Sequence, residues 1–332
     1  MWIFEADGRV ISTPVVKNSL VFIRTKDSIY ALDGMSGKII WQAKSRYDYY
    51  LSVAPQTFEN YLIVPEKYSR VGIFDIKTGQ RIWQFLSNYE GRKDANFNSN
   101  VEELTCINNI LYVARKNWKL SSYDLINNLV NWENNVEGRT SLYIAADDQA
   151  VYLGSGHSLL AYEAKTGKKL WQIDYESFVG PILLDGTTLF VTLNYLNDTR
   201  LVALDLGTLL VKWQINYNLI NETLINSLTI EGGVLYAGGS KLTAISKDDG
   251  SIMWSTREIG NIGKPVVINN KIYVRNTKTS LFEFDIETGQ ELGYLLIRAD
   301  TPMKNEPERG PAVADDLLII PFGDNRVFAY LP

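Results

Sequence analysis

The sequence is poor in the residues on which disulfide bonds and histidine chemistry depend. Its 332 residues include one cysteine, Cys106, and one histidine, His157. A single cysteine excludes an intramolecular disulfide, and a single histidine excludes both a zinc site built from histidines and a triad with a second histidine. Cys106 lies in the apolar run LTCIN and is predicted to be a small core residue, while His157 in GSGHS is predicted to lie in a hairpin turn.

Long apolar runs are also missing, and neither sign of charge dominates. No run approaches the ~20 apolar residues that a bilayer-spanning helix needs. The first residues, MWIFEADGRV, lack the basic start and the apolar stretch of a secretory signal. We therefore expect a cytoplasmic protein if Met1 is the true start, and a periplasmic or otherwise extracytoplasmic one if a leader was removed. The net charge of −5, spread over mixed acids and bases, gives no reason to expect a nucleic-acid partner.

The sequence is rich in aromatic residues and in one repeated hairpin pattern. Eight tryptophans and nineteen tyrosines are typical of a strand-rich protein. The stretch YALDGMSGKIIWQ at 30–42 returns as FDIKTGQRIWQF at 74–85, YEAKTGKKLWQID at 162–174 and FDIETGQELGYLL at 284–296. One turn sequence that recurs along a chain indicates a repeat architecture.

The repeat has the length of a propeller blade. Gly293 ends a series in which tryptophan recurs at the same place of the hairpin, and Tyr294 is expected to supply the aromatic ring there. The series is Trp41, Trp83, Trp132, Trp171, Trp213 and Trp254. Spacings of 42, 49, 39, 42, 41 and 39 residues suit a blade of four strands. The first unit is interpreted as strands at 11–16, 20–24, 28–33 and 38–43, without a helix signal.

The two ends of the chain complement each other. Residues 311–331 supply three strands of a further unit, and MWIFEA resembles a fourth strand with its tryptophan, Trp2. Counted through the join, Gly293 to Trp2 is 41 positions and Trp2 to Trp41 is 39, which matches the period. The prediction is an all-β protein whose residues 1–332 form a single domain. Its fold is an eight-bladed β-propeller of four-stranded antiparallel blades, with the ring closed by the N-terminal strand joining the last blade.

The recurring turn has a physical explanation. An aspartate such as Asp75 can accept bonds from turn amides, and the glycine four residues later, Gly79, supplies the positive φ of the turn. The tryptophan on the outermost strand is expected to pack on the neighbouring blade, where its burial stabilises the fold by roughly 3 kcal/mol or more. The alanine two residues before the aspartate leaves room for the ring. The predicted docking residues are Trp2, Trp41, Trp83, Trp132, Trp171, Trp213 and Trp254.

The pattern A-x-D-x-x-T-G-x-x-x-W resembles the tryptophan-docking motif of the PQQ-like (quinoprotein) β-propellers, and the resemblance covers the whole chain. ALDGMSGKIIW at 31–41 and AYEAKTGKKLW at 161–171 are the fullest matches, while Asn127–Asn128 and Gly207–Thr208 replace the Thr-Gly pair in two units. The motif is architectural, so the resemblance implies a fold rather than an activity. The family includes quinoprotein alcohol and glucose dehydrogenases. It also includes non-catalytic members, such as the scaffold lipoprotein of the outer-membrane β-barrel assembly machine, and this chain is more similar to that branch.

The resemblance implies what a quinoprotein dehydrogenase would need. Such enzymes hold the quinone with a stacked tryptophan and a Ca²⁺ ion coordinated by Glu, Asn and Asp, beside a catalytic Asp, and the alcohol-oxidising type adds a vicinal disulfide. One cysteine excludes that disulfide, and Trp118, the one tryptophan outside the docking series, is predicted to be a surface aromatic at a hairpin tip or strand start. Oxygen ligands for Ca²⁺ are offered by Asn98, Asn100, Glu102 and Glu103, although a solvated loop is the favoured interpretation. We predict no catalytic residue, no cofactor and no metal.

Binding function concentrates in loops on a rigid scaffold. The candidate partner- or ligand-binding residues lie where the chain leads into the inner strands: Arg9, Tyr49, Tyr50, Arg92, Asn100, Arg139, Asn226, Lys264 and Arg309. Bases outnumber acids there, which favours either a mildly positive funnel for an anionic ligand or acidic peptide, or the hydrated polar lining that every propeller needs. Two long connections, 87–100 and 297–310, are expected on this same face.

The leading functional hypothesis is a monomeric, non-catalytic propeller scaffold that binds another protein through this loop face. The alternative is a sensor that binds a small molecule or sugar in the central funnel. A PQQ-dependent dehydrogenase is the third hypothesis.

Overall fold

The computed structural model describes residues 1–45, 53–66, 70–85, 101–136, 141–195, 198–216, 224–276, 280–297, 310–322 and 324–332. These residues form β-strands joined by turns, and none of them is helical. The cause is in the sequence, where short segments rich in β-branched and aromatic residues alternate with turn residues such as Gly, Asn and Asp.

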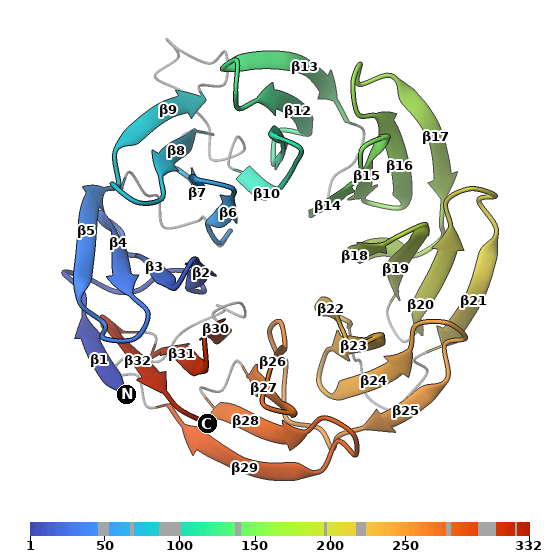
Figure 1. Ribbon diagram of the computed structural model, residues 1–332. Coiled ribbons are helices and arrows are strands. Elements are labelled where there is room, and N and C mark those ends of the chain that lie inside the picture. Colours follow the sequence, from blue (N-terminus) through green and yellow to red (C-terminus); the bar gives the residue numbers. More distant parts are fainter. Residues whose placement is uncertain are drawn as a thin grey trace. The chain divides into compact units, whose positions relative to one another are not determined.

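The described residues form eight antiparallel sheets of four strands each, the blades of an eight-bladed β-propeller (Figure 1). The first four sheets consist of β2 (Val15–Lys17), β3 (Leu20–Arg24), β4 (Ser28–Asp33) and β5 (Ile39–Lys44); β6 (Gln56–Phe58), β7 (Tyr61–Pro65), β8 (Val71–Asp75) and β9 (Arg81–Phe85); β10 (Val101–Ile107), β11 (Ile110–Arg115), β12 (Lys119–Asp124) and β13 (Leu129–Asn135); and β14 (Leu142–Ala146), β15 (Ala150–Ser155), β16 (Ser158–Glu163) and β17 (Lys169–Asp174).

The remaining four sheets follow the same chain order, except that the last one takes its outer strand from the N-terminus. They consist of β18 (Phe178–Asp185), β19 (Thr188–Tyr195), β20 (Asp198–Asp205) and β21 (Val211–Asn216); β22 (Ser227–Glu231), β23 (Val234–Gly238), β24 (Leu242–Ser246) and β25 (Ile252–Ser255); β26 (Val266–Ile268), β27 (Lys271–Arg275), β28 (Ser280–Asp285) and β29 (Glu291–Leu296); and β30 (Ala312–Ala314), β31 (Leu317–Pro321), β32 (Arg326–Tyr330) and β1 (Trp2–Glu5).

The N-terminal strand completes the last blade, as predicted. β1 pairs with β32 in a register that sets Trp2 opposite Ala329 and Glu5 opposite Arg326. The two ends of the chain therefore share one sheet, whose order is β1-β32-β31-β30. The first predicted strand, 11–16, is shorter than expected, because β2 begins only at Val15. Pro14 has no N–H to give to a ladder, which accounts for the late start.

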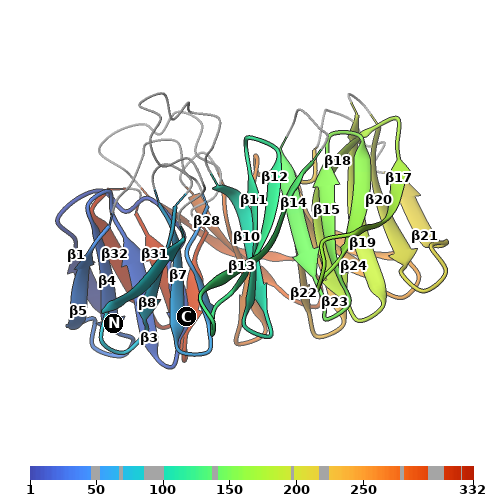
Figure 2. The same cartoon turned by 90° about the horizontal axis from the view of Figure 1, so that it is seen from above.

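The chain forms two compact units. The first contains Met1–Glu90, Gly238–Thr243 and Trp254–Pro332, and the second contains Gly91–Ala237 and Ala244–Met253. In the first unit β26 packs beside β30, β30 beside β2, and β2 beside β6 (Figure 1). Figure 2 shows three strands of the last sheet, β1, β32 and β31, from another side. In the second unit β10 packs beside β14, β14 beside β18, and β18 beside β22.

The core of each unit lies between neighbouring sheets. On β3, Val21 and Ile23 pack against the last sheet, in a cluster with Leu317 and Ile319. Phe22 points the other way and packs with Leu62 and Val64 of the second sheet, in a separate cluster. Because both faces of such a middle strand are covered, its sequence is a continuous apolar run rather than an alternating one.

Antiparallel order places the turns of a unit at two opposite edges. At the edge that we call the loop edge, the second strand of each sheet connects to the third and the chain leads into the next sheet. At the docking edge, the first strand connects to the second and the third to the fourth. In the first unit the loop edge includes residues 9–14 and 25–27, and the docking edge includes residues 34–37, 76–79 and 286–289.

The repeated turn at the docking edge is built as its sequence indicates. The Asp75 carboxylate accepts hydrogen bonds from the amides of Lys77 (3.0 Å) and Thr78 (2.8 Å) and from the Thr78 hydroxyl (2.8 Å). Gly79 has φ of 70°. The Trp41 indole donates to the Ile76 carbonyl at 3.0 Å, and a Cβ on Gly79 would lie 2.5 Å from the indole ring. Glycine is therefore required twice, for the left-handed backbone and for the close approach of the ring.

The same contact recurs between other neighbouring sheets. In the described residues, indole nitrogens donate to turn carbonyls in the pairs Trp2–Gly34, Trp41–Ile76, Trp132–Ala164, Trp213–Lys247 and Trp254–Ile286. Across its own sheet, each of several tryptophans stands opposite the small alanine of the motif: Ala31–Trp41, Ala161–Trp171, Ala203–Trp213 and Ala329–Trp2.

The structure corrects the sequence alignment of the fifth unit. Thr208, not Gly207, occupies the threonine place, because its hydroxyl donates to Asp205 at 2.9 Å. The residue at the glycine place is Leu209, whose φ is 58°. In the third unit Asn128 takes that place with φ of 57°. Asparagine tolerates this conformation, whereas leucine is strained in it.

Candidate partner-binding face

The structure describes three of the nine residues predicted for the loop face. Arg9, Asn226 and Lys264 are exposed, with Arg9 and Lys264 in the first unit and Asn226 in the second. The other six predicted residues lie outside the described residues: Tyr49, Tyr50, Arg92, Asn100, Arg139 and Arg309. The connection at 87–100 also lies outside them, as do residues 298–309 of the second connection.

Arg9 and Lys264 are both held at the loop edge of the first unit. Val10 forms a bridge with Thr25, and Ile262 forms an equivalent bridge with Asn276, each at the connection between second and third strands. The segments that lead into β2, β30 and β26 lie side by side, because the Gly310 amide donates to the Thr13 hydroxyl at 3.1 Å. A Cβ on Gly310 would also lie 3.3 Å from the Lys264 carbonyl oxygen.

A hydrogen-bond network fixes the segment that carries Arg9. The Asp7 carboxylate accepts from the hydroxyls of Thr25 (2.9 Å) and Ser28 (2.5 Å), and its amide donates to the Tyr30 hydroxyl (3.2 Å). Burial opposes ionisation of Asp7, but the hydrogen bonds from Ser28, Thr25 and Tyr30 outweigh it and lower the pKa of Asp7. The segment is therefore pre-ordered, which reduces the entropy that a binding partner would have to remove.

Buried arginines support the same edge, and the sequence reasoning missed them. Arg24, which is 1% exposed, donates to the carbonyl of Pro65 in the next sheet. Arg275 does the same to Pro321 at 2.6 Å. The available signal was the arginine that ends the second strand in LVFIR and KIYVR. These buried arginines tie neighbouring sheets together.

The candidate Ca²⁺ ligands of the second unit serve a structural contact, as far as they are described. Glu102 and Glu103 belong to strand β10, not to the solvated loop that the sequence suggested. Their carboxylates accept hydrogen bonds from the amides of Leu142 (3.1 Å) and Ile144 (2.8 Å), both of which lie in β14. Burial raises the pKa of Glu102. Both residues thus join adjacent sheets.

The sequence leads to separate predictions for the single cysteine, the single histidine and the tryptophan outside the docking series. Cys106 lies in β10 and is partly exposed, so it is not the core residue that was predicted. His157 lies in a turn, as predicted, and its ring packs on Phe178 with centroids 4.2 Å apart. Trp118 is 41% exposed in a turn with φ of 56°, which confirms a surface aromatic.

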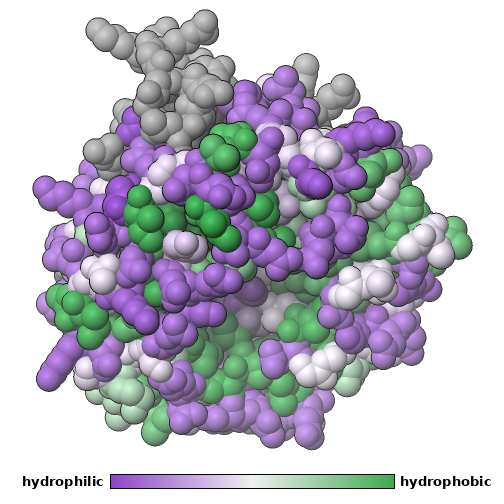
Figure 3. Space-filling view, turned by 45° about the horizontal axis from the view of Figure 1, so that its top comes forward, coloured by the Kyte–Doolittle hydropathy of each residue, from purple (hydrophilic) through white to green (hydrophobic). Residues whose placement is uncertain are grey.

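Within the described ranges, no group of three or more His, Cys, Asp or Glu residues is placed to hold a metal ion. A search of the same residues finds no helix that is long and apolar enough to cross a membrane. The face drawn in Figure 3 is largely hydrophilic, with hydrophobic side chains in separate groups. A protein partner binds a surface of this kind through hydrogen bonds to its polar side chains as much as through burial of apolar area.

Comparison with known protein families matches residues 1–172 and 217–332 to one family model, PQQ_2, described as "Outer membrane protein assembly factor BamB". The unmatched part, 173–216, contains the fifth sheet, in which Leu209 replaces the docking glycine.

Individual relatives support the same family. The outer membrane protein assembly factor BamB of Burkholderia pseudomallei (strain K96243) is 26% identical over 190 residues, which are 52% of this chain and 47% of that protein. The alignment thus spans about half the length of that relative.

Solved structures share the fold across nearly the whole chain. BamB from Moraxella catarrhalis has a TM-score of 0.73 at 12% identity, with 99% of each chain covered. A quinohemoprotein alcohol dehydrogenase from Comamonas testosteroni has a TM-score of 0.70 at 12% identity, covering 97% of this chain and 72% of the enzyme. At such identities the likeness shows the fold alone. The family model covers well over half of the residues, and the chain therefore belongs to the BamB-type family of PQQ-like β-propellers.

Proposed function

We propose that the chain is a non-catalytic scaffold that binds a protein partner in outer-membrane protein assembly. The observation that carries the proposal is the family match over residues 1–172 and 217–332, whose description names an assembly factor. The fold is shared with dehydrogenases, so the fold by itself does not favour either function.

The proposed binding surface is the loop edge, and Arg9 and Lys264 are the predicted cationic residues that the structure describes there in the first unit. Both are exposed, and the segment of Arg9 is pre-ordered by the Asp7 network. A rigid segment that presents a cation suits an acidic partner, because charge complementarity speeds encounter and selects the partner. Asn226, and the six residues outside the described ranges, remain part of the proposed face.

The test is a charge-reversal variant, Arg9→Glu with Lys264→Glu. Its expected property is at least tenfold weaker retention of the partner that co-purifies with the wild-type chain from its own cells. Lys38→Glu is the matched control, since Lys38 is an exposed cation at the docking edge of the same unit. Equal retention by the double variant and the control would contradict the proposed face, while circular dichroism verifies that both are folded.

The competing enzyme hypothesis has its own readout. A quinoprotein dehydrogenase gains quinone absorbance and Ca²⁺-dependent dye reduction when supplied with PQQ, Ca²⁺ and an alcohol. The scaffold hypothesis predicts neither signal. Appearance of both would overturn the non-catalytic assignment without bearing on the fold.

A further inference from the structure

The junction between the seventh sheet and the last sheet, as described, lacks a docked indole. On β29 the residue at the tryptophan place is Gly293, and a Cβ built there meets nothing within 4 Å. Tyr294, predicted to replace the ring, does not do so. It is 61% exposed and packs against Phe282, with centroids 6.0 Å apart.

The residue opposite Gly293 is changed as well. Where four other sheets pair alanine with tryptophan, this sheet pairs Glu283 with Gly293. The Glu283 carboxylate forms an ion pair with Lys271 at 2.7 Å. A bulky polar residue has therefore replaced the small one, and the ring itself is missing.

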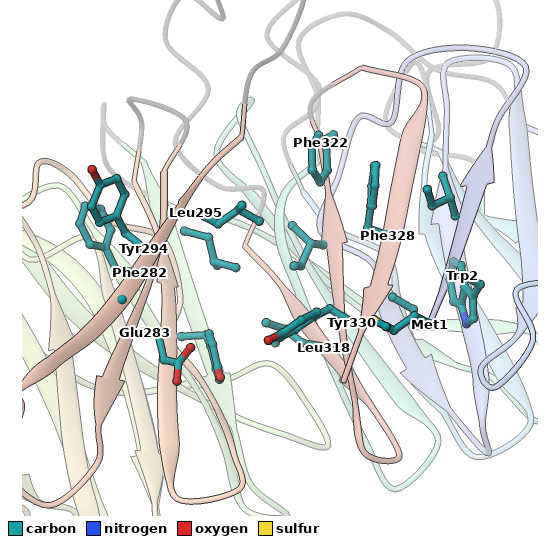
Figure 4. A pocket seen from close by; sticks show the side chains of 16 residues that line it. Met1, Trp2, Phe282, Glu283, Tyr294, Leu295, Leu318, Phe322, Phe328 and Tyr330 are labelled. Carbon is teal, nitrogen blue, oxygen red and sulfur yellow. The ribbon is translucent and has the colours of Figure 1, made fainter. Parts of the chain in front are cut away.

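These two changes leave a cavity of about 590 Å³ between the seventh sheet and the last sheet, wholly within the first unit. Figure 4 shows Glu283 and Leu295 on one side of it and Leu318, Tyr330 and Met1 on the other. This volume lies within the ~300–1,000 Å³ typical of sites for small organic ligands.

Among the polar groups of the lining, the Glu283 carboxylate and the Tyr273 hydroxyl come from the seventh sheet. Besides Glu283, the wall includes Tyr273, which is 2% exposed; its hydroxyl lies near the Glu283 carboxylate but makes no well-aligned hydrogen bond. Burial, followed by the negative charge of Glu283, raises the pKa of Tyr273, so the hydroxyl stays protonated. A buried hydroxyl without a partner is costly unless something in the cavity completes its hydrogen bonding.

We propose that this cavity is a binding site for a small, flat aromatic molecule with an N–H or O–H group. The packing of the protein itself indicates such a ligand, because at five other junctions an indole fills the corresponding place and donates to a carbonyl oxygen. Here the apolar walls accept the ring, while Glu283 and Tyr273 take its polar group. The site lies between two sheets, although its lining residue Phe322 belongs to a loop-edge connection, and the proposal does not depend on the proposed scaffold function.

Indole is the probe, with 1-methylindole as the analogue that lacks the N–H. Calorimetric titration of the 332-residue chain is expected to show saturable one-to-one binding of indole, and at least threefold weaker binding of 1-methylindole. Gly293→Trp fills the cavity from within and should weaken indole binding at least tenfold. Leu292→Trp is the control, because Leu292 is 49% exposed and does not line the cavity, so it should retain wild-type affinity.

A second variant keeps the test decisive if Gly293→Trp does not fold. Tyr273→Phe removes one hydroxyl at constant shape and should abolish at least part of the preference for indole over 1-methylindole. The absence of saturable binding up to the solubility limit of indole would overturn the proposal. So would unchanged affinity in folded Gly293→Trp, or an unchanged indole preference in Tyr273→Phe.

Discussion

The docking glycine offers the sharpest test of how blades are held together. In Gly79→Ala the new residue must adopt a left-handed backbone, with φ near 70°, and its methyl carbon would lie only 2.5 Å from the Trp41 ring. The backbone strain costs about 1–2 kcal/mol. Trp41 is 8% exposed, so displacing its ring forfeits part of the ~3–5 kcal/mol that complete removal of a buried tryptophan costs. The expected loss of unfolding free energy is about 3–5 kcal/mol.

Gly186→Ala is the matched control. Gly186 also has positive φ, 57°, but a Cβ there meets nothing within 4 Å. Only the strain applies, so we expect a loss of about 1–2 kcal/mol. Urea unfolding followed by tryptophan fluorescence and circular dichroism measures both variants.

A double-mutant cycle separates strain from ring displacement. In a Trp41→Ala background the clash is absent, so Gly79→Ala should then cost only about 1–2 kcal/mol, as in the control. The coupling energy between the two positions is therefore about 2–3 kcal/mol. A cost of Gly79→Ala that is the same in both backgrounds would refute the idea that the ring requires glycine.

Three further outcomes follow from other contacts. Leu209→Gly should stabilise the protein by about 1 kcal/mol in urea unfolding, because it removes a strained left-handed leucine, and a loss of stability would contradict this. Arg81→Leu should lower the unfolding free energy by about 3–5 kcal/mol, because the fully buried Glu66 side chain loses its two hydrogen bonds from Arg81. Arg257→Leu, which breaks the more exposed pair with Glu291, is the control and should lower it by no more than about 1 kcal/mol. Burial opposes ionisation of Asp75, but the hydrogen bonds from Thr78 and the Lys77 amide lower the pKa of Asp75 below its ordinary 3.8. The stabilisation of the fold by the Asp75 carboxylate is therefore present above about pH 4 and is lost as pH falls through the lower folded-state pKa. In Asp75→Asn the unfolding free energy should fall less steeply with decreasing pH, and an unchanged pH dependence would count against this account.

The repeat of about 40 residues was predictable from the sequence because local contacts determine the structure of its hairpin. Asp, Thr, Gly and Trp of the hairpin each make contacts that are set by residues a few positions away or by the next copy of the same hairpin. The pairing of β1 with β32 was predictable for a related reason, since the last unit lacked its fourth strand and the N-terminus supplied one.

The parts that sequence reasoning missed depend on contacts between different sheets. The roles of Arg24 and Arg275 appear only when the proline carbonyl of the next sheet is in place. The cavity at Gly293 was visible in sequence as a missing tryptophan. Whether the cavity stays empty depends on the direction of the Tyr294 side chain. Because successive side chains of a strand point to opposite faces, Tyr294 does not take the place of the missing ring at Gly293 and packs on Phe282 instead.

Native mass spectrometry of the protein, recovered gently from its own cells, tests the central claim most directly. The scaffold account predicts the chain in a stoichiometric complex with a protein of outer-membrane assembly, a complex that Arg9→Glu with Lys264→Glu weakens. Recovery of the chain without a protein partner, carrying a bound quinone and reducing dye in a Ca²⁺-dependent way, would contradict it.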